Sequence, residues 1–290
     1  MFVEGLYNYA DDNTVSRHDE TVENVKLLLE EATESALHWF DINDMEANPS
    51  KFQAMLIGRK DLKSDVNFNI RGSIVKPSAQ VKLLGVEIDE RLTFSPHISA
   101  ICAKAGRQLN ALARLSNVLS TKTKITIFNS FILCHFNYCP LVWHHCSKES
   151  MNKMEKVQER GLRIVYNDKF SDYADLLSKA NKQTLYIERL KRIALLVYKA
   201  INNEGPPVLH DLFEKKELNY NLRDSNKINQ PLVNTKKFGI HSLRYSGALL
   251  WNQLPFDVKN STDLKTFKNL IKKWDGSSCK CGVCLLCEVS

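Results

Sequence analysis

Apolar residues recur every three or four positions in several long stretches of the chain, which predicts helices over residues 20–40, 95–119, 121–138, 147–166, 184–201 and 264–274. Shorter stretches predict strands at 6–9, 14–16, 52–57, 66–70 and 81–88. The last of these is apolar on both faces except at Lys82 and Glu87, so it predicts a largely buried strand. The pattern therefore indicates an α+β fold: a small antiparallel sheet with one helix, then an all-α bundle and an irregular tail.

Local signals place two boundaries along the chain. Ser95-Pro96 predicts a helix start, because serine caps helices and proline fits their first position. Gly205-Pro206-Pro207 ends the helical stretch, and residues 219–237 are polar enough for a long loop. We therefore expect three parts: residues 1–94, a helical bundle over 95–204, and an extension over 205–290.

Charge is distributed unevenly along the 290 residues. Residues 1–100 contain 10 Lys and Arg against 17 Asp and Glu, a net charge of −7, whereas the remainder carries 30 against 16, a net charge of +14. A basic region of this kind suits a polyanionic partner. The chain contains no run of about 18 apolar residues and no signal-peptide pattern. We expect an intracellular protein, nuclear or cytoplasmic and not secreted, with no membrane partner.

The predicted strands at residues 6–9 and 14–16 form a tight β-hairpin. Two adjacent carboxylates, Asp11 and Asp12, follow Tyr9-Ala10 at its tip. Aspartate favours turns because its side chain bonds the local backbone, so the pair has a purely structural interpretation. Carboxylates on a rigid hairpin are also hard oxygen ligands, which hold Mg²⁺ and leave positions open for phosphate. A two-metal nucleotidyl-transfer site would need at least one more carboxylate from another strand.

Two basic stripes follow the predicted bundle helices. Helical spacing places the first stripe opposite the apolar face of residues 95–119 and the second along residues 147–166: Lys104, Arg107 and Arg114, then Lys153, Lys156, Arg160 and Arg163. Such stripes would make salt-dependent contacts with nucleic-acid phosphates. An ordinary solvated helix face is the alternative.

The eight cysteines fall into two groups. Cys102, Cys134, Cys139 and Cys146 lie in apolar stretches and are expected to be reduced core residues. Four more crowd the end of the chain, where they would either bind Zn²⁺ or form a free cysteine-rich tail: Cys279, Cys281, Cys284 and Cys287. Their C-x-C-x₂-C-x₂-C spacing is more cramped than that of common zinc knuckles. The histidines His135, His144 and His145 beside Cys146 are expected to pack or lie at the surface.

Several motifs together resemble the C-terminal half of a reverse transcriptase from a non-LTR retrotransposon of the jockey-like, LINE-type group. These motifs occur in the family's order: Asn8-Tyr9-Ala10-Asp11-Asp12, the Asn48-Pro49-Ser50-Lys51 loop, Leu84-Gly85-Val86, Tyr138-Cys139-Pro140-Leu141-Val142-Trp143, and Leu249-Leu250-Trp251-Asn252-Gln253-Leu254-Pro255. The resemblance implies a partial palm, a thumb and a C-terminal tail that hold an RNA or DNA primer-template.

The resemblance also implies roles for individual residues. Asp11 and Asp12 would be Mg²⁺ ligands. Lys51 would donate a proton to the departing pyrophosphate, with a solvated loop lysine as the alternative. Leu84, Gly85 and Val86 would grip the primer end, a role that is compatible with an ordinary buried strand. The basic stripes match what a thumb would need to ride along a duplex.

The resemblance leaves part of the active site unaccounted for. In the family, the fingers and the palm strand with the other metal-binding aspartate precede the Asp-Asp hairpin, whereas eight residues precede Tyr9 here. We therefore expect a truncated RNA-directed DNA polymerase that is inactive alone. The alternative is a non-catalytic nucleic-acid-binding module derived from the thumb and tail.

Overall fold

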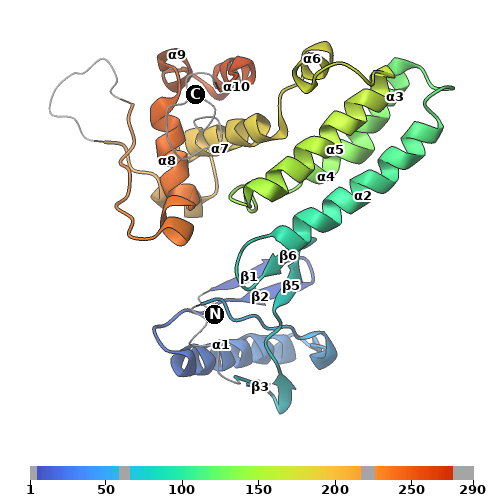
Figure 1. Cartoon of the computed structure of the whole chain (residues 1–290). Helices are drawn as coiled ribbons and strands as arrows, with labels where there is room; N and C mark the ends of the chain where they lie inside the picture. The colour runs from blue at the N-terminus through green and yellow to red at the C-terminus, as the bar shows by residue number, and fades with distance from the viewer. Residues whose placement is uncertain (1–4, 59–65, 217–225, 277–290) are drawn as a thin grey trace. The chain divides into compact units, whose positions relative to one another are not determined.

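The computed structural model describes residues 5–58, 66–216 and 226–276, and the chain divides into two compact units, Met1–His97 and Ile98–Ser290 (Figure 1). Each unit is described by itself. The described strands pair only as three separate two-stranded antiparallel sheets: β1 (Leu6–Tyr9) with β2 (Asp12–Val15), β3 (Phe68–Ile70) with β4 (Ser73–Val75), and β5 (Gln80–Leu83) with β6 (Val86–Asp89). With the helices described below, they confirm the predicted α+β class.

The first unit contains one long helix, α1 (Val22–Ile42), where residues 20–40 predicted one. Thr21 caps it, because the threonine Oγ1 accepts a hydrogen bond from the Asn24 backbone N–H at 3.2 Å. The helix contacts β3, in which Phe68 is almost completely buried. The Glu30 carboxylate on α1 also accepts a hydrogen bond from the Asn69 backbone N–H at 2.7 Å. Helix and hairpin are thus joined by both apolar packing and a charged hydrogen bond.

The strand predicted over residues 52–57 is wrong. Residues 49–51 form the short 3₁₀ helix η1 (Pro49–Lys51), and beyond it the chain makes an isolated bridge between Ala54 and Pro77. The Ser78 N–H donates to the Ala54 carbonyl at 2.8 Å. Proline has no N–H to donate, so the pairing cannot extend through Pro77 as a regular ladder.

The single buried strand predicted over residues 81–88 is also wrong, because the chain reverses within it. Leu84 and Gly85 form the turn between β5 and β6, with φ values of +45° and +83°. Positive φ at both central residues is characteristic of the tight hairpin turns whose twist matches the paired strands. As a result Leu84 lies at the tip with 39% of its surface exposed.

The second unit is helical, and the first bundle helix begins just before it. Its elements are α2 (Ser95–Arg114), α3 (Thr121–Ile127), η3 (Phe128–Ile132), α4 (Leu133–Asn137), α5 (Lys148–Tyr166), α6 (Tyr173–Lys179), α7 (Leu185–Ile201), η4 (Pro207–Leu212), η5 (Lys236–Ile240), α8 (Leu243–Gln253), α9 (Phe256–Lys259) and α10 (Leu264–Lys273). Ser147 and Thr184 cap α5 and α7, because each side chain accepts a hydrogen bond from a backbone N–H of the first helical turn. None of the described helices has the length and apolar character needed to cross a membrane.

The helix predicted over residues 121–138 is not a single α-helix. A π-helical turn, η3, separates α3 from α4, and its first residue is Phe128. The Phe128 ring packs against Gly161 of α5 so closely that a Cβ atom there would lie 2.1 Å from it. The absence of a side chain at Gly161 therefore lets the two helices pack at this point. Sequence periodicity does not reveal this contact.

Aromatic residues form the core that joins α7 to the C-terminal helices. The rings of Tyr198 on α7 and Phe267 on α10 stack at 4.3 Å between centroids. Trp251 on α8 is fully buried, and its ring lies 6.0 Å from that of Phe267. Residues of the expected extension thus share one apolar core with a helix of the expected bundle.

Glu155 connects α5 to the start of α7. Its carboxylate accepts hydrogen bonds from the backbone N–H groups of Leu185 and Tyr186, at 3.2 and 2.9 Å, and from the Tyr173 hydroxyl at 2.7 Å. The first N–H groups of a helix have no partner within the helix, and the helix dipole favours an anion beside them. One carboxylate therefore fixes α5, α6 and α7 together.

Replacing Glu155 with alanine is expected to lower the free energy of unfolding of the second unit by about 2–3 kcal/mol, because three hydrogen bonds to a charged group are lost. Urea denaturation followed by tryptophan fluorescence measures this change. Glu149→Ala is the matched control: Glu149 lies on the same helix, but its side chain is 78% exposed and pairs only with Lys153. Equal effects of the two substitutions would contradict the role of Glu155.

Candidate catalytic hairpin and nucleic-acid interface

The Asp-Asp pair lies at the tip of the β1–β2 hairpin. Tyr9 pairs with Asp12, so Ala10 and Asp11 form a two-residue loop, in which Ala10 has a φ of +52°. The Asn13 side chain donates to the Asp11 carbonyl at 3.2 Å and supports the turn. Both aspartates are exposed, and neither carboxylate has an ion-pair partner among residues 5–58, 66–216 and 226–276. Two free hard-oxygen ligands are therefore presented to solvent.

The donor set of this hairpin suits Mg²⁺ in type but supplies only part of a coordination shell. Carboxylate oxygens are the ligands that Mg²⁺ takes from proteins, usually one or two alongside phosphate and water. Across the described residues, no group of three or more His, Cys, Asp or Glu side chains is arranged to hold a metal ion. Asp11 and Asp12 therefore match Mg²⁺ in ligand type, and their role as metal ligands stays a prediction.

Lys51 and the Leu84-Gly85-Val86 segment lie elsewhere in the same unit. Lys51 ends η1 and is exposed, and within the described part of the chain it forms no ion pair with either hairpin aspartate. Leu84 and Gly85 form the tip of the β5–β6 hairpin, whereas Val86 is buried. Leu84 and Gly85, two of the three primer-grip candidates, therefore occupy an exposed hairpin turn that the sequence pattern did not predict, whereas Val86 is buried in β6.

Asp89 holds the chain between this hairpin and α2. Its carboxylate accepts hydrogen bonds from the Phe94 N–H at 2.6 Å and from the Thr93 N–H at 3.1 Å. Burial raises the pKa of Asp89, but hydrogen bonds from Thr93 and Phe94 outweigh it and leave the pKa below its ordinary value. The charged carboxylate thus fixes the turn from which α2 begins.

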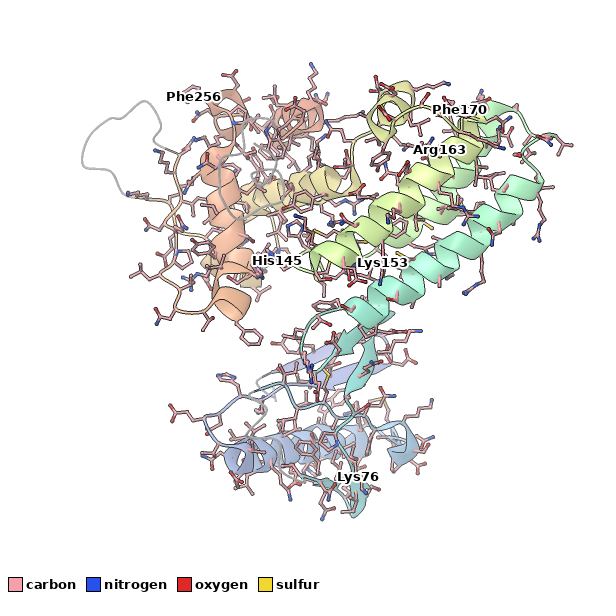
Figure 2. The ribbon with its side chains drawn as sticks, viewed as in Figure 1. Lys76, His145, Lys153, Arg163, Phe170 and Phe256 are labelled. Carbon is pink, nitrogen blue, oxygen red and sulfur yellow. The ribbon has the colours of Figure 1, made fainter. Side chains whose placement is uncertain are left out.

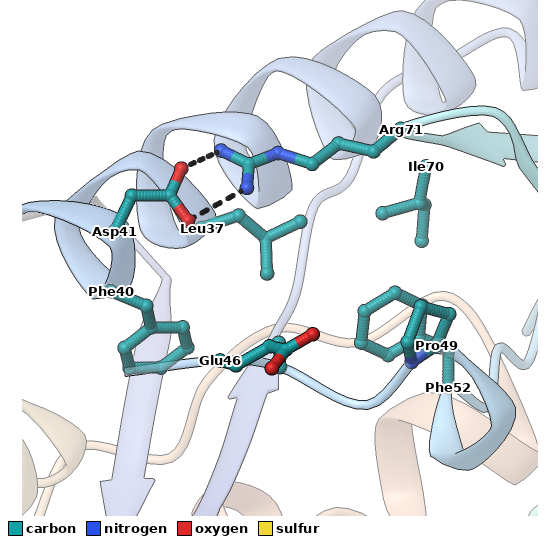
Figure 3. Close-up of a pocket in the computed structure, with 9 residues that line it drawn as sticks. Leu37, Phe40, Asp41, Glu46, Pro49, Phe52, Ile70 and Arg71 are labelled. Atoms are coloured by element: carbon teal, nitrogen blue, oxygen red, sulfur yellow. Dashed lines mark hydrogen bonds and ion pairs between the residues drawn. The ribbon is translucent and has the colours of Figure 1, made fainter. Parts of the chain in front are cut away.

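A pocket of about 240 Å³ lies beside α1 in the first unit (Figure 3). Its lining combines apolar side chains with the charged groups of Asp41, Glu46 and Arg71; the apolar part includes Leu37, Phe40, Phe52 and Ile70. Arg71 lies at the edge, where its guanidinium is 2.7 Å from the Asp41 carboxylate and 3.0 Å from that of Glu34. The hydrogen bond from Arg71 lowers the pKa of Asp41. Because Arg71 engages both carboxylates, they are not free to join a metal site.

The basic stripe on α2 is fully displayed. Lys104, Arg107 and Arg114 are all exposed, and none has a carboxylate partner within the described part of the chain. From Lys104 to Arg114, these three cations span about 15 Å along the helix axis. This stripe is available to a polyanion.

The stripe on α5 is partly neutralised (Figure 2). Lys153 pairs with Glu149 at 2.9 Å, and Arg163 pairs with Glu159 at 2.7 Å. These are i,i+4 pairs, a spacing that the sequence itself shows. Lys156 has no ion-pair partner among the described residues.

Arg160 completes the α5 stripe and reaches across to the neighbouring helix. Its guanidinium donates to the Asn110 side chain of α2 at 2.5 Å, which places α2 and α5 side by side (Figure 1). The two stripes therefore belong to adjacent helices of one unit. Among the described residues, four stripe members have neither an ion pair nor a side-chain hydrogen bond and are called the unpaired cations: Lys104, Arg107, Arg114 and Lys156.

Comparison with curated proteins finds polymerases of mobile elements. The chain is 24% identical over 164 residues to a probable RNA-directed DNA polymerase from transposon BS of Drosophila melanogaster, and 25% identical over 164 residues to the RNA-directed DNA polymerase from mobile element jockey of the same species. A probable polymerase from transposon X-element is 26% identical over 149 residues. The resemblance to jockey-type polymerases is confirmed.

These matches cover about half of this chain and less than a fifth of each relative. The first two cover 55% of this chain but only 18% of each relative's length. No protein-family model matches the chain, and no solved structure matches it significantly. The similarity therefore relates this chain to a limited part of much longer polymerases.

The cysteines provide no metal centre in the described structure. Cys279, Cys281, Cys284 and Cys287 lie outside the described residues, so zinc binding there stays a prediction. The four other cysteines are free thiols, but only Cys146 is buried. The expected core position is wrong for Cys134, which lies on the exposed side of α4, and for Cys139, which is exposed with a φ of +44°.

The histidines next to Cys146 pack inside the second unit. His144 is buried and stacks on Tyr186 at 5.5 Å, and burial holds the pKa of His144 well below its ordinary value. The His145 ring stacks on that of His241 at 5.6 Å. Burial, followed by the neighbouring His241, lowers the pKa of His145 to about 4. Both histidines are neutral at pH 7, in agreement with a packing role.

Sequence reasoning missed one charged member of this cluster, Arg189. Its side chain is 2% exposed, and its guanidinium lies 5.3 Å from the Trp143 ring and 5.5 Å from the Tyr186 ring. Such cation–π contacts partly replace the hydration that the charge loses. The available signal was the helical spacing that places Arg189 next to the apolar face of residues 184–201.

Proposed function

We propose that this chain is the palm end, thumb and C-terminal extension of an RNA-directed DNA polymerase of the non-LTR type. In this proposal, the palm portion is residues 1–94, the thumb is 95–204 and the extension is 205–290. The similarity to jockey-type polymerases over 55% of the chain carries the proposal. The exposed Asp-Asp hairpin and the unpaired cations of α2 and α5 support it independently.

Asp11 and Asp12 would hold Mg²⁺ on one side of the catalytic centre. The bound ions would activate the 3′-hydroxyl of the primer and neutralise the departing pyrophosphate. Lys51 would supply a proton to that leaving group, and the Leu84-Gly85 turn would contact the primer end. The cations of α2 and α5 would bind the phosphates of the primer-template.

Asp11 and Asp12 are neighbours at the hairpin tip, and no group of three or more His, Cys, Asp or Glu side chains within residues 5–58, 66–216 and 226–276 is placed to hold a metal ion. The 290-residue chain would therefore bind nucleic acid without extending a primer. A second polymerase segment would supply the fingers, the remaining carboxylate and the other wall of the nucleotide pocket.

Primer extension tests this directly. With Mg²⁺, an RNA template and labelled nucleotides, the purified chain is expected to incorporate nothing in a template-dependent manner. Co-expression with the fingers and first palm strand of a related polymerase is expected to restore synthesis. In that assembly, Asp11→Asn should lower the rate at least about a hundredfold, because a metal ligand loses its charge.

The matched control is Asp44→Asn in the same assembly. Asp44 is exposed on the first unit and has a φ of +53°, a conformation that asparagine adopts readily. It should leave the rate unchanged. Template-dependent synthesis by the 290-residue chain alone would contradict the incomplete site, and equal rates for the two variants would contradict the metal role of Asp11.

A second function rests on the unpaired cations alone: a nucleic-acid-binding module with no catalytic role. Both functions include nucleic-acid binding, so a binding assay does not distinguish them. The DNA sequence upstream of this coding sequence does. An in-frame strand with an aspartate and a fingers region would favour the polymerase. Stop codons there would favour the binding module.

A further inference from the structure

Phe170 is the most exposed aromatic side chain among the described residues, with 95% of its surface open to solvent. It lies in the loop between α5 and α6, at the same end of α5 as Arg163 (Figure 2). A phenylalanine in this position contributes almost nothing to the core of the second unit. Its apolar ring is therefore available to an external partner.

The loop that carries Phe170 is fixed by the Asp168 carboxylate. Asp168 accepts hydrogen bonds from the backbone N–H groups of Phe170 at 3.2 Å and Ser171 at 3.0 Å, and from the Ser171 hydroxyl at 2.7 Å. These bonds, with those from Ser171 first, lower the pKa of Asp168 to about 2, so the carboxylate is charged at pH 7. The ring is thus presented on an ordered turn, which reduces the entropy lost when a partner binds.

Cations precede and flank the exposed ring. The α5 stripe runs toward this loop from Lys153 to Arg163, a length of about 15 Å along the helix axis. Lys169 is exposed immediately before Phe170, and Lys179 lies 3.7 Å from Asp168, where it offsets that negative charge. Proteins that bind single strands combine a cationic track for the phosphates with aromatic rings on which bases stack.

We propose that Phe170 is a stacking platform for an unpaired base of the nucleic acid whose phosphates contact the α5 stripe. The proposal rests on the proposed nucleic-acid binding and adds a single-stranded component to it. A flat ring recognises any base by its face, so this contact favours unpaired over paired nucleotides without reading their sequence.

Fluorescence anisotropy with a single-stranded RNA and a blunt RNA–DNA duplex tests the platform. Phe170→Ala should weaken binding of the single strand roughly five- to thirtyfold. It should leave duplex binding within about twofold and the salt dependence of single-strand binding unchanged, because no phosphate contact is lost. A 2-aminopurine in the single strand should be quenched by the wild type and not by Phe170→Ala.

Two further substitutions separate stacking from general apolar contact. Phe170→Trp should bind the single strand at least as tightly as the wild type, whereas Phe170→Leu should resemble Phe170→Ala. Thermal unfolding should be the same for all three variants because the ring is not packed. Asp172 is exposed two residues further along, and Asp172→Asn should raise the affinity a few-fold by removing repulsion of the strand.

The outcomes distinguish this inference from the proposed function. If the wild type binds the single strand with steep salt dependence and Phe170→Ala or Phe170→Leu binds equally well, the platform is refuted while nucleic-acid binding stands. If the wild type binds neither nucleic acid, the proposed function fails and the platform fails with it. If sedimentation shows a wild-type dimer that Phe170→Ala makes monomeric, the ring contacts a second copy of the chain and the platform is refuted.

Discussion

Reversing the four unpaired cations of α2 and α5 is expected to lower nucleic-acid affinity about a thousandfold at about 150 mM salt. The change is the quadruple substitution of Lys104, Arg107, Arg114 and Lys156 by glutamate. Each lost phosphate contact removes the entropy of counterion release, and each new carboxylate repels the backbone. The slope of log affinity against log salt should fall by up to about 3.6, or about 0.9 for each contact. Anisotropy titrations across a salt series measure both quantities.

The control reverses four exposed lysines that lie outside the stripes, namely Lys76, Lys216, Lys265 and Lys268. The net charge changes by the same amount, so any general electrostatic effect is matched. This control should lose only a few-fold in affinity. If both quadruple variants lose affinity equally, the stripes are ordinary solvated faces and the polyanion responds to net charge alone.

Two cations of the α5 stripe form ion pairs, so individual stripe residues are expected to contribute unequally to nucleic-acid affinity. Lys153 and Arg163 already have carboxylate partners at i−4, and breaking such exposed pairs costs little. Their contact with phosphate competes with Glu149 and Glu159. Single Lys153→Gln and Arg163→Gln variants should therefore weaken binding less than Lys156→Gln does.

The starts of α1, α5 and α7 were predictable because they depend on local signals, whereas α8 (Leu243–Gln253) was not predicted as a helix. Thr21, Ser147 and Thr184 each accept a hydrogen bond from a backbone N–H three residues ahead, and each precedes an apolar stripe with helical spacing. The signal is therefore complete within a few residues of the helix start. Short α6 was missed because seven residues give too few repeats for a period to be recognised.

Features that depend on distant contacts were not predictable. The reversal at Leu84-Gly85 is local and was missed for a different reason: its neighbours are apolar on both faces, so the stretch was read as one strand. Phe128 packs against Gly161 of another helix, and the pKa of His145 is lowered first by burial and then by His241. No local pattern contains this information, since these partners meet only when the helices pack.

Some features of the candidate sites could also be predicted from the sequence, and others could not. The adjacency of Asp11 and Asp12 is covalent, so their shared position at the hairpin tip follows from the sequence. Exposure of the α2 stripe followed from helical periodicity. Phe170 was not predicted as a site because exposure of one aromatic ring in a loop has no sequence signature.

Acid is expected to destabilise the second unit strongly through His144 and His145. His145 is held near His241 and Ser246, whose hydroxyl lies 3.0 Å from the His145 Nε2 atom, and His144 faces Tyr186 and Arg189. Protonation would place a charge in a buried site, beside another histidine or an arginine. The folded state therefore resists protonation of both rings.

The sign of the pH effect follows from proton binding. The folded His145 pKa is about 4, whereas an unfolded histidine titrates near about 6.5, so the unfolded state binds more protons between these values. The free energy of unfolding should be greatest above about pH 6.5 and should fall by up to about 3 kcal/mol from His145 alone as the pH approaches 4. The lowered pKa of His144 adds to this loss in the same direction.

Urea denaturation between about pH 7 and about pH 4.5 measures the loss, because three of the four tryptophans, Trp143, Trp251 and Trp274, lie in the second unit. Combining His144→Phe, which retains an aromatic ring against Tyr186, with His145→Gln should remove most of the slope. His18→Gln in the first unit is the control, because His18 is exposed and should leave the slope unchanged. A wild-type free energy of unfolding that stays constant over this range would contradict the lowered pKa of both histidines.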